Sequence, residues 1–239
     1  MGVVTPHAAA GPEVELPAMT RGRVTTVVSR TVPSPTAPPG HAQLRASTGP
    51  AALDRAAATF RGSTLAAVVH ASTTCGYVLG HREETALVER LSQRFDVPAV
   101  ASCAAAVAAL RAQQVERVQL VHPPWFDDGF DELGAAYFRS QGFDAVVTTA
   151  SGLPRDPARV DPQDVVDWVG RHVEDRAEAV FLAGNGFRAA GTVEQLELRT
   201  GRLVLQANQA LLWGILTATG TRWDVTGRGR LLRERTTTT

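Results

Sequence analysis

The fold is decided by the stretch Val68-Val69-His70-Ala71-Ser72-Thr73-Thr74-Cys75-Gly76-Tyr77. The apolar residues from Leu65 to Val69 predict a buried strand that ends in a hydroxyl-rich turn. A helix is expected next, starting near Glu83 or slightly earlier. The first turn of a helix has N–H groups without internal acceptors and carries partial positive charge, so this junction can hold a carboxylate or a phosphate. The alternative is an ordinary turn capped by serine and threonine.

Strands and helices alternate on both sides of this stretch. β-Branched and apolar runs predict strands at residues 2–5, 23–32, 65–69, 97–100, 115–121, 143–149, 179–182 and 203–205. Helices are expected from residue 12 onward and over 51–60, 83–95, 103–113, 127–141, 161–173, 192–198 and 208–220. Residues 33–49, rich in Pro, Gly, Ser and Thr, are predicted to form a long loop that could cover a site as a lid. This alternation predicts an α/β fold with parallel sheets.

The two halves of the chain repeat each other. A strand followed by a proline loop occurs at Pro6 and Pro123, 117 residues apart. A strand followed by a turn of small residues occurs at Ser72 and Gly184, 112 residues apart. A third pair, strands followed by helices rich in alanine and leucine, has an offset of 106 residues. Similar offsets in unchanged order predict two pseudo-symmetric α/β lobes, each a parallel sheet flanked by helices.

We expect the first lobe to span residues 1–114, with residues 209–239 packing back on it, and the second to span 115–208. Ligands of open α/β sheets bind at the carboxyl ends of the strands. The turns after four of the predicted strands should therefore face one cleft between the lobes.

Composition limits the partners of this chain. Its 239 residues carry 24 Lys and Arg against 24 Asp and Glu, and 6% of them are aromatic. No basic face or stacking platform for a nucleic acid is therefore expected. The apolar runs are too short to span a bilayer, so no membrane contact is expected. The absence of a signal peptide and of a disulfide framework fits the cytoplasm. No metal site and no cofactor are predicted, and a homo-oligomer is left open.

Five segments carry a resemblance to a known family. They are Gly2-Val3-Val4-Thr5-Pro6-His7-Ala8-Ala9-Ala10-Gly11, Ser72-Thr73-Thr74, Pro123-Pro124-Trp125-Phe126-Asp127-Asp128, Ala183-Gly184-Asn185-Gly186 and Ala207-Asn208-Gln209-Ala210-Leu211-Leu212-Trp213. In order and spacing they resemble the motifs of the arylmalonate decarboxylase and maleate isomerase group of the aspartate/glutamate racemase superfamily. The motifs are individually loose and jointly specific, and they run nearly end to end.

The resemblance implies cofactor-free chemistry at a carbon next to a carboxylate. In such enzymes N–H groups and hydroxyls of two turns hold one carboxylate and the enediolate that develops from it, each donor contributing about 3 kcal/mol. Cysteines at one or both turns then move the proton or attack a double bond. The substrate-binding residues implied here are Ser72, Thr73, Thr74, Trp125, Gly184, Asn185, Gly186 and Asn208.

The departures from the family pattern concern the thiols. The two cysteine positions fall on Ser72 and Gly184, so a two-cysteine mechanism is not expected. Cys75 lies three residues beyond Ser72, and if Ser72 caps the helix the two share one face. The helix N-terminus would then lower the thiol pKa and make Cys75 a candidate proton donor. Alternatively, Cys75 is a small buried residue behind the turn.

Histidines offer a second candidate for the proton donor. His7 and His122 follow equivalent strands of the two halves, and imidazole titrates near neutral pH. His7 is the stronger candidate, although either residue could simply be hydrogen-bonded in its loop. His70 lies inside the predicted strand and is expected in the core. Ser72 has no base within sequence reach, so it is expected as an anion donor and not as a nucleophile.

These residues predict a cofactor-independent lyase or isomerase that acts on a small carboxylate or dicarboxylate through an enediolate. Its single proton donor is Cys75 or His7, and decarboxylation is favoured because racemisation needs two proton-transfer groups. Two alternatives stay open. One is a catalytically degenerate carboxylate-binding protein, and the other is a tailoring enzyme with altered chemistry in the same cleft.

Overall fold

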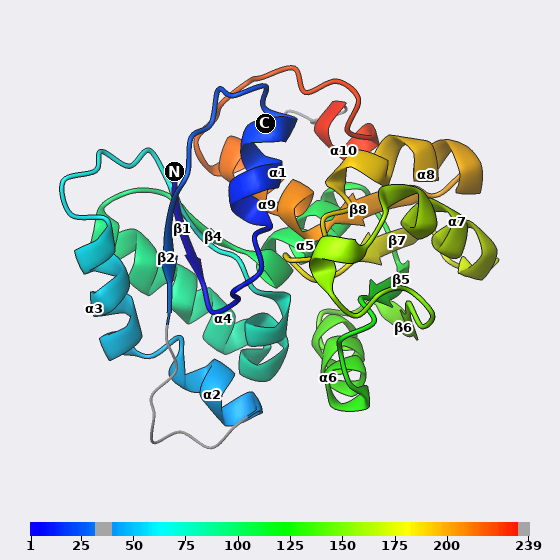
Figure 1. Cartoon of the computed structure of the whole chain (residues 1–239), viewed down its shortest axis with the longest axis horizontal. Coiled ribbons are helices and arrows are strands. Elements are labelled where there is room, and N and C mark those ends of the chain that lie inside the picture. Colours follow the sequence, from blue (N-terminus) through cyan, green and yellow to red (C-terminus); the bar gives the residue numbers. More distant parts are fainter. Residues whose placement is uncertain (32–39, 234–239) are drawn as a thin grey trace.

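Two four-stranded parallel sheets form the centre of the molecule, as the computed structural model shows for residues 1–31 and 40–233 (Figure 1). The first sheet has the order β2-β1-β3-β4, with β1 at Gly2–Thr5, β2 at Val27–Arg30, β3 at Val68–His70 and β4 at Ala99–Ala101. The second has the order β6-β5-β7-β8, with β5 at Arg117–His122, β6 at Asp144–Thr149, β7 at Ala179–Leu182 and β8 at Leu203–Gln206. The same strand order in both halves confirms the predicted fold class.

Helices flank both sheets (Figure 1). In the first half they are α1 Pro12–Met19, α2 His41–Ala46, α3 Pro50–Thr59, α4 Thr73–Phe95 and α5 Ser102–Ala112. In the second half they are α6 Asp128–Arg139, α7 Pro162–His172, α8 Val193–Thr200, α9 Ala207–Ala218 and α10 Arg230–Arg233, with 3-10 turns η1 at Pro157–Arg159 and η2 at Ala190–Thr192.

Helix α4 begins ten residues earlier than the predicted start at Glu83. Its first residue is Thr73, because the Ser72 side chain accepts a hydrogen bond from the Cys75 N–H and caps the helix. Gly80, at φ 73° and ψ 162°, interrupts the helix and kinks it. The part predicted from amphipathic spacing is the segment after this kink.

The predicted loop over residues 33–49 is also corrected. Residues 41–46 form the short helix α2, so this part of the predicted lid is helical. Residues 32–39 lie outside the described residues. Strand β2 is shorter than the predicted 23–32 and begins at Val27.

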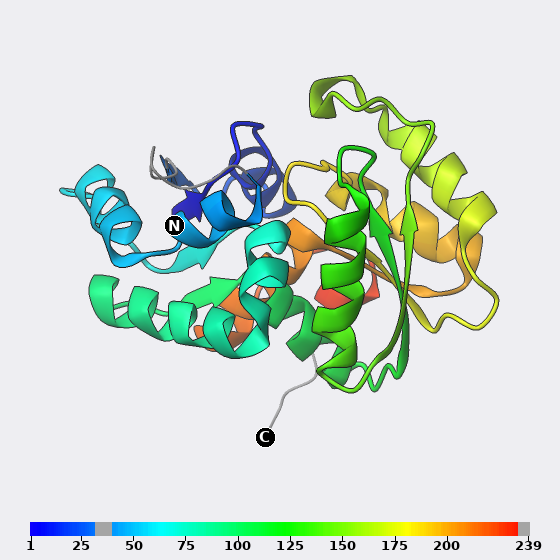
Figure 2. The same cartoon turned by 90° about the horizontal axis from the view of Figure 1, so that it is seen from below.

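The two halves pack against each other through helices (Figures 1 and 2). Helix α9 follows β8 and packs against α5 and α1 of the first half, while α6 packs against α4. Gly214 allows α9 to approach β4, since a Cβ at this position would lie 2.9 Å from Val100. This packing and the parallel register bring the carboxyl ends of β1, β3, β5 and β7 to one region, with Val4 level with His70 and Val121 level with Leu182.

Candidate functional site

A cavity of about 410 Å³ lies where the loops after β1, β5, β6 and β7 meet. It is lined by Pro6, His7, Ala8, Ala9, Trp125, Phe126, Arg155, Pro157, Gly184, Asn185 and Gly186. Four of the predicted binding residues and His7 therefore line it. The other four, Ser72, Thr73, Thr74 and Asn208, are buried outside this lining. All of these loops follow the carboxyl ends of parallel strands, the usual place for a ligand in such sheets.

The turn after β3 holds an imidazole. His7 Nε2 lies 2.9 Å from Ser72 Oγ and 3.4 Å from Thr74 Oγ1, and Ser72 Oγ also accepts from the Cys75 N–H at 3.0 Å. Ser72 thus has a base within reach, contrary to expectation. Burial lowers the pKa of His7 to about 4, so its imidazole is neutral at neutral pH. The N–H of Thr74 donates to no residue within 1–31 or 40–233.

Cys75 points away from the cavity. Its side chain is fully buried, with Sγ 3.6 Å from Ser47 Oγ and 3.7 Å from the carbonyl oxygen of Leu44. Burial raises the pKa of the Cys75 thiol to about 11, which is opposite to the lowering expected from the helix N-terminus. This placement favours the alternative interpretation of Cys75 as a small buried residue and does not support it as the proton donor. Cys103 is also fully buried, and its thiol donates to the carbonyl of Thr73.

The turn after β7 lines the cavity and contains backbone N–H groups without an acceptor among the described residues. Gly184 has a φ of 87°, which glycine adopts without strain, and its N–H donates to Thr73 Oγ1 at 3.1 Å. In the part of the chain that the structure describes, the N–H groups of Asn185 and Gly186 have no acceptor. Gly11 packs directly on this turn, since a Cβ there would lie 1.9 Å from the carbonyl oxygen of Asn185. Two N–H groups are therefore available to an anion.

The side chain of Asn185 joins the first turns of three helices. Its Oδ1 accepts from the Thr73 N–H of α4 at 3.1 Å and from Ser102 Oγ of α5 at 3.0 Å. Its Nδ2 donates to Asn208 Oδ1 of α9 at 2.8 Å. Because each helix N-terminus carries partial positive charge, their convergence favours an anion nearby. The N–H of Thr73 is used in this network, so Thr73 is not a free backbone donor.

The other two histidines considered from the sequence, His122 and His70, lie in the core. His122 Nδ1 is 2.5 Å from Asp131 Oδ1 and its Nε2 is 3.1 Å from the hydroxyl of Tyr77, so both ring nitrogens are occupied away from the cavity. His70 is fully buried as expected, and neither of its ring nitrogens has a partner among the described residues. Burial lowers the pKa of His70 to about 4 and keeps its ring neutral.

Sequence reasoning did not single out Phe126 and Arg155, which also line the cavity. Arg155 lies on the loop after β6, is exposed, and forms no ion pair with any described acidic residue. The signal for it was the position of this Gly- and Pro-containing loop at the carboxyl end of a predicted strand.

Residues 1–31 and 40–233 contain neither a candidate metal cluster nor a candidate membrane-spanning helix. No group of three or more His, Cys, Asp or Glu side chains there could hold a metal ion. Nor is any helix in those ranges long and apolar enough to cross a bilayer.

A model of the arylmalonate decarboxylase family matches residues 51–232. The chain belongs to this family. Its structure is similar to the maleate isomerase Iso from Pseudomonas putida S16, with a TM-score of 0.82, 21% identity, and coverage of 97% of this chain and 96% of that chain. It is also similar to arylmalonate decarboxylase, with a TM-score of 0.78, 23% identity, and coverage of 97% of both chains.

A third similar structure is the Nocardia farcinica maleate cis-trans isomerase bound to TRIS, with a TM-score of 0.80 and 25% identity over 98% of this chain and 97% of that chain. No curated protein matches the chain. The resemblance inferred from the five motifs is confirmed, and the chain is related to a decarboxylase and to isomerases.

Proposed function

We propose that this chain is a cofactor-independent lyase or isomerase that acts on a small carboxylate or dicarboxylate through an enediolate, with His7 as its single proton donor. One observation carries the proposal: Asn185 and Gly186, whose N–H groups have no acceptor among the described residues, line the same cavity as His7. A carboxylate bound to these N–H groups would have its adjacent carbon within the cavity that His7 borders.

The backbone donors would stabilise the enediolate. Negative charge that develops on the carboxylate oxygens is held by donors fixed before the reaction, each contributing about 3 kcal/mol. The N-termini of α4, α5 and α9 add positive potential at the same place. Arg155, which has no acidic partner among the described residues, would attract the anion or bind a second acidic group of the substrate.

His7 would receive its proton when the substrate binds. Burial holds the pKa of His7 at about 4. An anion bound close to the ring favours the imidazolium and raises this pKa. The hydroxyls of Ser72 and Thr74 hold Nε2 and orient the ring. In the decarboxylation of a dicarboxylate one carboxylate leaves as CO2, the electron pair of the broken C–C bond is delocalised into the second carboxylate as the enediolate, and the carbon between them takes the His7 proton.

A single donor favours decarboxylation over racemisation. Racemisation needs an acid and a base on opposite sides of the carbon, and the position of the second family cysteine is Gly184, which has no side chain. Both cysteines of the chain are buried. One proton-transfer group is sufficient to protonate the enediolate left by CO2.

Proton NMR in heavy water tests the proposal. Malonates, maleate, and amino-acid-like and hydantoin-like carboxylates are incubated with the wild type, His7→Ala and Cys75→Ala. The rate of turnover or deuterium incorporation should fall by a factor of about 10² to 10⁴ in His7→Ala. It should be unchanged in Cys75→Ala. The reverse pattern would rule out His7.

The pH dependence separates the two donors independently. With His7 as the acid, kcat/KM should fall as pH rises above about 4, because the free enzyme loses the required proton. If Cys75 were the donor, kcat/KM should stay constant from about pH 5 to about pH 9, because a thiol with a pKa of about 11 remains protonated over this range.

The second candidate is a carboxylate-binding protein that has lost the chemistry. It is favoured by the substitution of both family cysteine positions, at Ser72 and Gly184. In that case carboxylates would raise the melting temperature of the wild type while no substrate in the panel reacts or exchanges deuterium. Arg155→Gln should weaken this thermal response under either function.

A further inference from the structure

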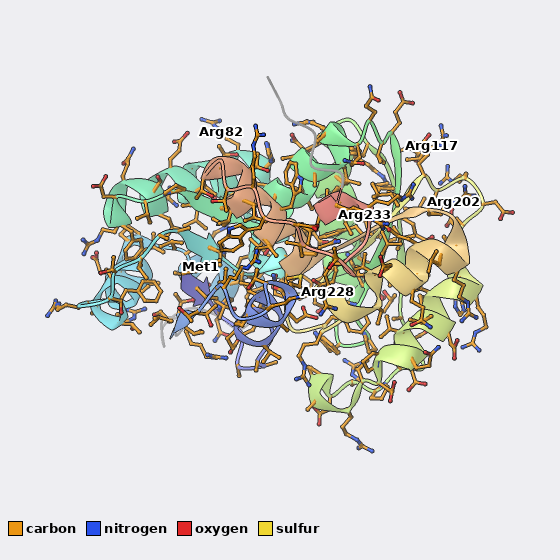
Figure 3. The ribbon with its side chains drawn as sticks, turned by 90° about the horizontal axis from the view of Figure 1, so that it is seen from above. Met1, Arg82, Arg117, Arg202, Arg228 and Arg233 are labelled. Carbon is orange, nitrogen blue, oxygen red and sulfur yellow. The ribbon has the colours of Figure 1, made fainter. Side chains whose placement is uncertain are left out.

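A second cavity, of about 360 Å³, lies beside the segment that follows the turn after β7. It is bordered by α1, by the segment that leads into η2, and by Arg228 near the C-terminal end of the described chain (Figure 3). None of its lining residues belongs to the first cavity. We call it the Arg188/Arg228 cavity after the two cationic side chains that line it.

Neither arginine forms a direct ion pair within residues 1–31 and 40–233. Many other arginines of the described chain are paired with an acidic side chain, as in Arg117 with Glu178 and Arg199 with Asp167. Arg188 and Arg228 form no ion pair with any acid of the described chain. A Cβ at Gly191 would lie 3.6 Å from Arg228 Nη1, so this guanidinium lies close over the backbone of the cavity wall. Two guanidinium groups therefore border one cavity without a direct ion pair, although the carboxyl group of Glu15 in the same lining interacts with both at longer range.

Glu15 is the one carboxyl group among the lining residues of this cavity, and it is engaged elsewhere. Its Oε1 accepts from the Ala190 N–H at 2.8 Å and its Oε2 accepts from Asn208 Nδ2 at 2.6 Å. The residue is 7% exposed, and burial raises the pKa of Glu15 to about 7. Its negative charge is thus reduced near neutral pH, and it does not form a salt bridge with either arginine.

The rest of the lining is apolar. Val14 is 44% exposed, and Met19 and Val160 also border the cavity. Guanidinium groups bind carboxylates and phosphates through paired N–H donors. An apolar wall beside such donors suits a ligand with a short hydrocarbon body.

We propose that the Arg188/Arg228 cavity is a second binding site, separate from the candidate active site, for a small organic anion with a carboxylate or phosphate group. Arg188 and Arg228 bind the anionic group, and Val14 and Met19 contact its apolar part. The inference rests on this cavity alone and is independent of the lyase reaction.

Arginine-selective labelling with phenylglyoxal, read by mass spectrometry, tests the site in the full chain. Inorganic phosphate is titrated in one arm and butyrate in the other, at constant ionic strength. Labelling of Arg188 and Arg228 should slow by about tenfold at a saturating millimolar concentration, while the exposed Arg82 on α4 is unaffected. No protection, or equal protection of Arg82, overturns the proposal.

Calorimetry on charge-matched variants gives the second measurement. Both are made in an Arg155→Gln background, so that the cation of the first cavity does not contribute. The affinity for phosphate or butyrate should fall by at least about tenfold in the double variant Arg188→Gln/Arg228→Gln. The control double variant Arg61→Gln/Arg82→Gln should keep the affinity of the parent. Equal affinities in the two variants overturn the site. Stronger protection by phosphate than by butyrate identifies a phosphate ligand, and the reverse identifies a carboxylate.

Discussion

The turn after β3 and the turn after β7 occupy equivalent places in two like sheets, yet they satisfy their backbones in different ways. In the first turn, side chains form the hydrogen bonds: Ser72 caps α4, and the hydroxyls of Ser72 and Thr74 contact Nε2 of His7. In the second turn, the N–H groups of Asn185 and Gly186 have no acceptor among the described residues and line the cavity.

Under the proposed function, this difference separates the positioning of the proton donor from the binding of the substrate. A symmetric pair of turns with a cysteine in each would place one proton-transfer group on each side of a substrate carbon. Here the first turn orients an imidazole that comes from the β1 loop, and the second carries only glycine at its cysteine position. Like topology therefore supports unlike roles, and four substitutions test this contrast.

The largest loss of stability is expected from Gly11→Ala, which places a side chain against the second turn. The new Cβ would lie 1.9 Å from the carbonyl oxygen of Asn185, so the β1 loop and the turn must separate. We expect urea denaturation to give a loss of about 3 kcal/mol in the free energy of unfolding, together with weaker carboxylate binding. Gly49→Ala, where the nearest contact is 3.4 Å, should cost no more than about 1 kcal/mol. Equal losses in both variants would contradict the close approach.

Glu15→Gln tests the support beneath the second turn through pH. Burial raises the pKa of Glu15 from 4.5 to about 7, so the folded state favours the protonated carboxyl. The protonated Glu15 carboxyl therefore contributes fully to the free energy of unfolding below pH 4.5, and this contribution is lost as the pH rises through 7. Relative to the wild type, the variant should therefore gain up to about 3 kcal/mol over this range.

The comparison with the wild type is needed because His7 and His70 act in the opposite direction. Burial lowers the pKa of each to about 4, so their contribution is lost as pH falls through 4. Urea denaturation at several pH values measures the difference. A matched change at the exposed Glu132, Glu132→Gln, should leave the pH dependence unaltered. A difference that is constant with pH would argue against the raised pKa of Glu15.

Ser72→Ala removes the orienting hydroxyl of the first turn and should have a moderate effect. Loss of the cap is expected to cost about 1 kcal/mol of stability. Loss of the contact to His7 Nε2 should lower kcat about tenfold with little change in KM. Thr74→Val keeps the cap and removes only the 3.4 Å contact, so its effect on kcat should be smaller. Steady-state kinetics of the two variants measure kcat and KM. A larger decrease of kcat in Thr74→Val than in Ser72→Ala would assign the orienting role to Thr74.

The smallest effect on turnover is expected from Cys75→Ala. The thiol is fully buried against α2 and lies away from the cavity, so turnover should be unchanged. With the pKa of Cys75 at about 11, the native thiol should also fail to react with a disulfide reagent at pH 8 and react only in denaturant, roughly in step with unfolding. Fast labelling of the native protein would show that Cys75 is accessible.

Much of the fold could be predicted from the sequence because buried strands of parallel sheets are near-continuous apolar runs. Ala179–Leu182 was located at its observed bounds in this way. The start of α4 could not be found, since Gly76 and Gly80 lower helix propensity at the predicted boundary. Tertiary packing overrides this: a Cβ at Gly76 would lie 2.7 Å from Cys103 Sγ, so glycine is what allows α4 to pack on α5.

The candidate site was predictable in its backbone and less so in its side chains. The small-residue turns at Ser72 and Gly184 stand out because such turns follow buried strands. The contact between His7 and Ser72 joins residues 65 positions apart and depends on strand register, which single-sequence patterns do not specify. The direction of Cys75 likewise depends on α2, a helix in a stretch predicted as loop.

Asn185 has a further consequence for mutational tolerance. One amide contacts the starts of α4, α5 and α9, so an apolar replacement breaks all three of these hydrogen bonds at once. A library designed to broaden substrate scope should therefore keep residue 185 fixed. Diversity belongs at Trp125, Phe126 and Arg155, whose side chains line the cavity without joining these helix starts, so that selection alters specificity without losing folded protein.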